Sequence, residues 1–139
     1  MQFKEFSHQY WMSQAVTLAK EIKSEVPVAA LIVRDNQLIS SAVNKIEYLN
    51  DATAHAEMLA IREASRILGN WRLTDCILYS TLEPCTMCKG AITNSRISTL
   101  VFGAYDSSND VNVEIIGGIL ELEAGKLLKD FFNCKRLKV

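Results

Sequence analysis

No apolar run in this sequence approaches the roughly 20 residues that a helix needs to span a bilayer. The first twenty residues contain Lys4, Glu5 and His8, and they lack the apolar core of a signal peptide. Cysteine is scarce too, because four cysteines in 139 residues are not the framework of a disulfide-rich domain and suit a reducing compartment. We therefore expect a cytoplasmic protein that has no contact with a membrane.

Internal repeats and low-complexity linkers are also absent from the sequence, so nothing in it divides the chain. Its composition, 49% hydrophobic and 22% charged, is that of an ordinary globular protein with enough residues for a core. We predict a single domain over residues 1–139. The formal net charge is −1, yet basic residues gather at the end of the chain: Lys126, Lys129, Lys135, Arg136 and Lys138. They either contact a phosphate backbone or simply favour a helix C-terminus and solubility.

The first third of the chain predicts a helix followed by a hairpin. Apolar residues recur at helical spacing over 7–24, and Pro27 is expected to end that helix. The continuous apolar run 28–33 predicts a strand that is buried on both faces. Residues 34–37, Arg-Asp-Asn-Gln, have the composition of a turn and lead to a hairpin partner over 38–43.

The remaining chain alternates strands and helices. Strands are expected at 76–81 and at 97–102, the second of them closed by Gly103, and a last helix is expected over 119–134. The expected buried side of that helix consists of Leu120, Leu127, Leu128, Phe131 and Phe132. Strands that alternate with helices after an opening hairpin predict an α/β protein, a three-layer α/β/α domain with a central mixed sheet.

One stretch, residues 81–88 (Thr-Leu-Glu-Pro-Cys-Thr-Met-Cys), joins the strand at 76–81 to a predicted helix. Pro84 suits the first positions of a helix because its φ angle is already helical. Cys85 and Cys88 are three residues apart, which places both sulfurs on one face of the first turn. Unpaired backbone N–H groups and the helix dipole favour thiolates there. Two thiolates at this spacing are half of a zinc site.

A second helix is predicted from an N-cap at Thr53 to a stop at Gly69. His55 and Glu57 fall in its first turn. Residues two apart do not share a helix face. Because side chains tilt toward the N-terminus of a helix, both can nevertheless reach an atom that lies beyond the helix end.

The order H-x-E and then P-C-x-x-C is the signature of zinc nucleobase deaminases. Here it is made of His55-Ala56-Glu57 and Pro84-Cys85-Thr86-Met87-Cys88. We predict one zinc ion per chain, held by His55, Cys85 and Cys88, with water as the fourth ligand, since three protein ligands characterise a catalytic zinc and four a structural one. Glu57 would then move protons to and from that water.

Three other residues are alternative fourth ligands. Cys76 opens an apolar strand and Cys134 follows two phenylalanines, so both are expected to be ordinary buried cysteines. His8 is expected to be a surface residue of the first helix.

The sequence resembles the bacterial tRNA-specific adenosine deaminases, which belong to the cytidine deaminase superfamily and convert the wobble adenosine of tRNA to inosine. The resemblance covers most of the chain. It is carried by Glu25-Val26-Pro27-Val28, Asn44, Asp51, Thr53-Ala54-His55-Ala56-Glu57, Asn70-Trp71-Arg72-Leu73, Leu78-Tyr79, Thr81-Leu82-Glu83-Pro84-Cys85, Met87-Cys88, Ser95-Arg96-Ile97, Val101-Phe102-Gly103-Ala104, Gly118-Ile119-Leu120 and Asp130-Phe131-Phe132.

This resemblance implies the fold of that superfamily, one Zn²⁺ on the three ligands above, and an acid/base role for Glu57. It also implies a homodimer that binds the anticodon stem-loop of tRNA. The implied substrate contacts are Val28 and Leu82 as pocket walls, Asn44 on the nucleoside, the Ala56 backbone N–H on the base edge, Asp106 facing the flipped nucleotide, and Phe132 flanking the loop.

Some features depart from that family. Ala29 stands where the family usually has glycine, Ala52 stands where it usually has proline, and the segment between Asp106 and Gly117 is shorter. The alternative enzyme is therefore a deaminase of a free base or nucleoside of the guanine, cytosine or cytidine type. An alternative from another class is an RNA-binding module with a structural zinc, against which Glu57 argues because a structural zinc needs no carboxylate beside an open ligand position.

Overall fold

The computed structural model describes residues 6–106 and 114–136, with side chains up to residue 133. The elements follow in the order α1 (His8–Lys20), β1 (Ala29–Arg34), β2 (Gln37–Val43), α2 (Ile46–Leu49), α3 (Ala56–Leu68), β3 (Cys76–Leu82), α4 (Thr86–Asn94), β4 (Thr99–Ala104), β5 (Glu114–Ile116) and α5 (Glu121–Arg136).

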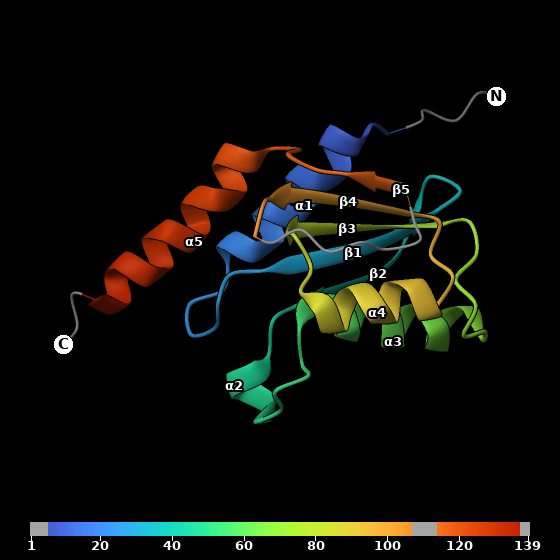
Figure 1. Cartoon of the computed structure of the whole chain (residues 1–139), viewed down its shortest axis with the longest axis horizontal. Helices are drawn as coiled ribbons and strands as arrows, with labels where there is room; N and C mark the ends of the chain where they lie inside the picture. Colours follow the sequence, from blue (N-terminus) through green and yellow to red (C-terminus); the bar gives the residue numbers. More distant parts are fainter. Residues whose placement is uncertain (1–5, 107–113, 137–139) are drawn as a thin grey trace.

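Within the described residues, five strands form one sheet in the order β2-β1-β3-β4-β5. β1 pairs antiparallel with both β2 and β3, whereas β3, β4 and β5 run parallel to one another. α1 and α5 contact one face of the sheet, and α3 contacts the other face with α4 beside it (Figure 1). This confirms the predicted three-layer α/β/α fold with a mixed sheet.

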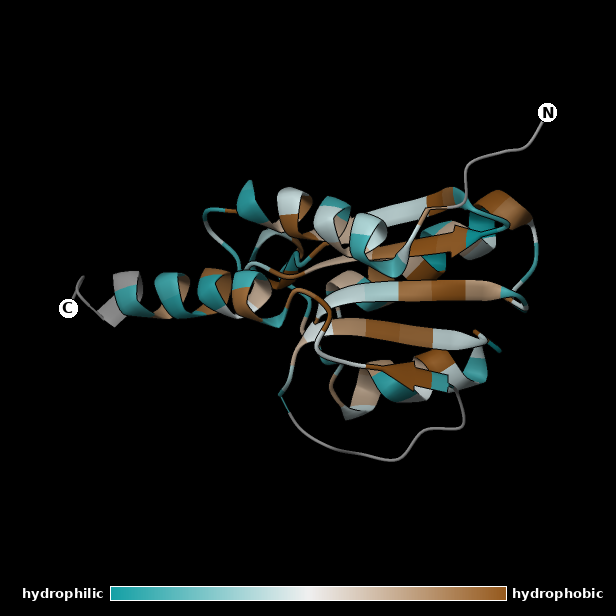
Figure 2. Ribbon diagram, turned by 90° about the horizontal axis from the view of Figure 1, so that it is seen from above, coloured by the Kyte–Doolittle hydropathy of each residue, from teal (hydrophilic) through white to brown (hydrophobic). Residues whose placement is uncertain are grey.

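The inner strand β1 explains why the layers form. Its residues from Ala29 to Val33 are all buried, and the inner strands are apolar along most of their length (Figure 2). Ile32 packs in the cluster on the α3 side and Leu31 in the cluster on the α1 side, because successive side chains point to opposite faces. The turn to β2 places Asp35 and Asn36 at positive φ, as a two-residue hairpin turn requires.

The first helix is shorter than predicted. α1 ends at Lys20, seven residues before Pro27, so the proline does not end it. The segment that follows instead carries Glu25 to α2, a short helix that we did not predict. The buried Glu25 carboxylate accepts hydrogen bonds from the backbone N–H groups of Glu47 and Tyr48, at 3.0 and 2.7 Å. This tertiary contact satisfies the start of α2, which no neighbouring residue in the sequence does.

Gly103 lies inside β4 and does not close it, contrary to the prediction. A Cβ at this position would be 2.8 Å from the carbonyl oxygen of Thr81 and 3.0 Å from the Cβ of Ala124 in α5. The absence of a side chain is therefore what lets α5 approach the sheet. β4 continues to Ala104, which pairs with Leu82 of β3. β5, which the sequence did not reveal, pairs with the other end of β4, from Thr99 to Val101.

We expect Gly103→Ala to destabilise the fold by about 1–3 kcal/mol, the usual cost of overpacking a well-packed site. Urea unfolding measures this as a lower midpoint at an unchanged slope. Gly90→Ala is the matched control, because Gly90 lies in α4 with nothing within 4 Å of the added Cβ. That variant should be neutral or slightly more stable. Equal midpoints for the two variants would contradict the assigned role of Gly103.

The last helix, α5, extends past the end of the sheet in two perpendicular views (Figures 1 and 2). Leu127 and Leu128 pack against the core, as predicted. Phe132, near the C-terminal end of α5, does not pack against the core, since it is 47% exposed. Across residues 6–106 and 114–136, we find no helix with the length and apolar character to cross a membrane.

Candidate active site

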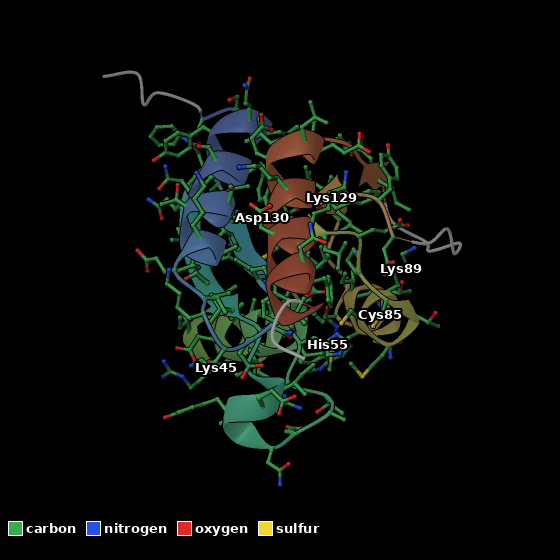
Figure 3. All side chains as sticks on the ribbon, turned by 90° about the vertical axis from the view of Figure 1, so that its left-hand side faces the viewer. Lys45, His55, Cys85, Lys89, Lys129 and Asp130 are labelled. Carbon is green, nitrogen blue, oxygen red and sulfur yellow. The ribbon has the colours of Figure 1, made fainter. Side chains whose placement is uncertain are left out.

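Two helix starts meet at the carboxyl end of β3. His55 immediately precedes α3, Cys85 immediately precedes α4, and Cys88 is the third residue of α4. β3 delivers the second of these starts and the loop after α2 delivers the first. Consequently both positive helix ends lie beside the same three side chains, where they favour anions. Figure 3 shows His55 and Cys85 next to each other at this end of the protein.

The predicted helix caps are wrong by one or two residues. The cap of α3 is His55 and not Thr53, because the Asp51 carboxylate accepts hydrogen bonds from both the backbone N–H and the hydroxyl of Thr53. That local turn holds Thr53 outside the helix. The cap of α4 is Cys85, so Pro84 precedes the helix and does not open it.

The three ligand atoms fit a tetrahedral zinc ion. His55 Nδ1 lies 3.7 Å from Cys85 Sγ and 3.5 Å from Cys88 Sγ, and the three atoms are within 4.8 Å of one another. Bonds of about 2.3 Å to sulfur and about 2.1 Å to nitrogen give a tetrahedral S–N edge of about 3.6 Å. The donor set of one imidazole and two thiols is also one that zinc prefers over magnesium or calcium.

Burial raises the pKa of the Cys88 thiol, and the nearby Glu57 and Cys85 raise it further. A divalent cation held among these groups offsets that effect, so metal binding here releases protons. Burial likewise raises the pKa of Glu57, which is 4% exposed, while its own backbone N–H, Cys88 and His55 lower it. A buried carboxyl group beside the ligand cluster is placed to accept and return a proton.

A cavity of about 190 Å³ opens on these residues. It is lined by Val26, Val28, Asn44, Ile46, His55, Glu57, Leu82, Glu83, Cys85 and Asp106. The family resemblance implies substrate contacts for Val28, Asn44, Leu82 and Asp106, and all four line this cavity. The cavity also includes Val26, Ile46 and Glu83. Val26 and Glu83 belong to stretches that carry the family resemblance, but no role at the site was assigned to them.

Two other assigned residues are not among the residues that line the cavity. Ala56 is buried as the first residue of α3, where backbone N–H groups have no partner within the helix. Phe132 is on the exposed face of α5 and is not among the lining residues. Most of the shortened segment that follows Asp106 falls on residues 107–113, outside the described residues.

The alternative ligands do not join the cluster. Cys76 is buried at the opposite end of β3, as expected. His8 is not a plain surface residue, because its Nδ1 lies 2.8 Å from the hydroxyl oxygen of Tyr79, whose pKa burial raises to about 12. The side chain of Cys134 lies outside the described part of the chain.

A mixed sheet flanked by helices, with one histidine and two cysteines between two helix starts and a buried glutamate beside them, defines a zinc-dependent nucleobase deaminase. Residues 6–104 match the family described as the cytidine and deoxycytidylate deaminase zinc-binding region.

Similar proteins identify the group within this family to which the chain belongs. The tRNA-specific adenosine deaminase of Bacillus subtilis is 40% identical over 92% of this chain and 90% of its own length. A solved structure from a study of A-to-I editing by tRNA:A34 deaminases superposes with a TM-score of 0.81 at 35% identity, over 86% of this chain and 99% of the other. The chain belongs to the tRNA-specific adenosine deaminases of the cytidine and deoxycytidylate deaminase family.

A guanine deaminase from Bacillus subtilis is also similar. It is 42% identical, with a TM-score of 0.68, over 72% of this chain and 66% of its own. The likeness covers less of each chain than the one to the tRNA:A34 deaminase.

Proposed function

We propose that this chain, acting in the cytoplasm as one domain over residues 1–139, converts adenosine to inosine at the wobble position of a tRNA anticodon loop. Water is consumed and ammonia is released. The observation that carries the proposal is the shared cavity, which is lined by His55, Cys85 and Glu57 together with Asn44 and Asp106. The relatives support the choice of substrate, since two tRNA-specific adenosine deaminases are 40% and 42% identical over 92% and 94% of this chain.

His55, Cys85 and Cys88 would hold the zinc ion, which lowers the pKa of a water molecule and so supplies a nucleophile at neutral pH. The proton transfers fall to Glu57. Its carboxylate accepts a proton as the water oxygen attacks C6 of adenine, and it delivers that proton to N1 of the ring. A second transfer through the same carboxyl converts the departing amino group to ammonia, which leaves Glu57 in its starting state.

The cavity is small for a whole nucleotide. Its volume of about 190 Å³ is below the roughly 300–1,000 Å³ of sites for drug-sized ligands. A single planar base fits such a space, between the apolar walls of Val28 and Leu82. The buried Asn44 side chain and the Ala56 N–H would supply directional hydrogen bonds to the nucleoside, which fix the base against the zinc site.

The mouth of the cavity suits a polymer. Asp106 forms part of its wall and is itself exposed, so it can also face a nucleotide next to the flipped one. Beyond it, a hollow of about 340 Å³ includes Tyr105, Lys126 and Lys129. An aromatic ring beside lysines is the usual composition of a surface for single-stranded nucleic acid. The role of Phe132 on the neighbouring face of α5 stays a prediction.

The substrate can be tested by direct competition. We expect the purified protein to form inosine in an anticodon stem-loop that carries a wobble adenosine and to leave guanine, cytosine, cytidine and free adenosine unchanged. Ammonia release and nucleoside analysis of the digested RNA measure both outcomes. The alternative is a free-base deaminase, to which the similarity to a guanine deaminase points. Deamination of guanine with an unmodified stem-loop would establish that alternative.

Neutralising Lys135, Arg136 and Lys138 together is expected to weaken stem-loop binding. The log–log salt slope should flatten by roughly one unit for each phosphate contact that is lost. Their side chains lie outside the described part of the chain. Unchanged affinity and slope would assign the basic end to solubility alone.

We further propose that the chain works as a homodimer. α3 and α4 lie together on one face (Figure 1), and large apolar side chains are exposed on them, including Ile67 and Met87. Covering such side chains with a second copy would remove apolar surface from water. Sedimentation equilibrium on the zinc-loaded protein should give twice the mass of one chain. A monomer at micromolar concentration would count against the proposal.

A further inference from the structure

A lysine lies buried next to the zinc ligands. Lys89 follows Cys88 in α4, and its side chain is only 3% exposed. Its Nζ is 2.9 Å from Oε2 of Glu83, whose side chain is 8% exposed. Figure 3 shows Lys89 in α4 and Cys85 at the start of that helix. Buried lysines are rare and need a charged partner, so this pair calls for an explanation.

Glu83 connects the ion pair to the cavity. Its second carboxylate oxygen, Oε1, accepts a hydrogen bond from the backbone N–H of Asp106 at 3.0 Å, and the Glu83 N–H donates to the Ala104 carbonyl oxygen at 2.8 Å. One side chain therefore joins three segments: the loop that carries Cys85, the first turns of α4, and the segment that leaves β4. Glu83 and Asp106 also both line the cavity.

The charge of Lys89 determines whether that connection lasts. A buried carboxylate without a cation is strongly disfavoured, so it would rotate toward water or take up a proton. Either change weakens the hydrogen bond from Asp106, because a charged acceptor binds an N–H group more strongly than a neutral one. If the carboxylate stays ionised, the cavity also carries an uncompensated negative charge, which repels a polyanion such as RNA.

We propose that Lys89 is a positioning residue for substrate binding, which acts through Glu83 to hold Asp106 in the cavity wall and to neutralise the carboxylate there. The inference rests on the proposed RNA substrate. Lys89 does not contact the reacting atoms in this account, and the zinc ligands keep their places without it. Its effect should therefore fall on KM and on RNA affinity, with a smaller effect on kcat.

The test compares single and double variants in the full-length, zinc-loaded protein. Lys89→Met removes the charge at similar length. Glu83→Gln with Lys89→Met removes both charges but keeps a carbonyl oxygen that can accept the Asp106 N–H. Glu83→Met with Lys89→Met removes both charges and the acceptor. The probe is an anticodon stem-loop with a wobble adenosine, measured by equilibrium binding and by steady-state deamination.

We expect Lys89→Met to weaken stem-loop affinity and to raise KM by about tenfold or more, the effect of losing one hydrogen bond to a charged group. The Gln–Met pair should recover most of that affinity, whereas the Met–Met pair should not. Metal analysis should give one zinc per chain in each variant. Hydrogen exchange supplies a readout besides activity, because the Asp106 amide should lose protection in Lys89→Met and in the Met–Met pair alone.

Two results would overturn the inference. The first is equal RNA affinity in the Gln–Met and Met–Met pairs, which would make Lys89–Glu83 a packing feature without a role at the cavity. The second is an unchanged KM in a folded Lys89→Met protein. Failure of the wild-type protein to bind or deaminate the stem-loop would instead reject the proposed substrate. In that case hydrogen exchange at Asp106 still reports whether Lys89 holds this segment.

Discussion

Glu57→Ala is expected to lose deamination by about 10²–10⁴-fold or more, with fold and zinc content retained. Glu57 is buried at the start of α3 and lines the cavity beside His55 and Cys85, yet it is not needed as a metal ligand. Without its carboxylate, no described side chain of this cavity other than Glu83 and Asp106 offers a carboxyl group, and Glu83 is paired with Lys89. Turnover should fall because proton transfer in both directions is lost.

Single-turnover deamination, circular dichroism and metal analysis together test this expectation. Glu57→Gln is the second variant, since it keeps the volume of the side chain and separates proton transfer from packing. Glu63→Ala is the matched control on the same helix, where the exposed Glu63 pairs only at the surface with Arg66, and it should leave turnover unchanged. Near-normal turnover in a folded Glu57→Gln protein would remove Glu57 from the mechanism.

Cys88→Ala is expected to abolish tight zinc binding and to lower activity by roughly 10³-fold or more, because a catalytic metal contributes several kcal/mol to the transition state. It should also lower the melting temperature to that of wild-type protein treated with a strong chelator, since a ligand that binds only the folded state stabilises it. Cys88 is fully buried within the ligand cluster. Without its sulfur, only His55 and Cys85 remain to bind the metal.

Cys76→Ala separates metal loss from packing loss. Cys76, the first residue of β3, is as fully buried as Cys88. It lies outside the ligand cluster. It should show a comparable loss of packing with one zinc per chain and normal turnover. One zinc per chain in Cys88→Ala, measured by atomic absorption, would disprove the assigned ligand set.

Local chemistry explains what could be predicted for the fold. β1 was predictable because a continuous run of apolar residues favours a strand in a sheet that is covered on both faces. The first five residues of β1 are indeed buried. The end of α3 at Gly69 was predictable because glycine adopts the left-handed conformation of a helix C-cap without strain. The contact of Glu25 with α2 and the close approach of α5 to Gly103 could not be predicted. Both are contacts between residues that are distant in the sequence.

The same division holds at the site. The zinc ligands and Glu57 could be predicted from the sequence, because ligand chemistry restricts the residue types and each pair is spaced within one helix turn. Tertiary packing, in contrast, is what brings Asn44 and Asp106 to one cavity and buries Lys89 against Glu83. In the sequence Lys89 is an ordinary charged residue of a helix. Its burial follows from how α4 packs near the ends of β3 and β4. No local sequence pattern predicts this packing.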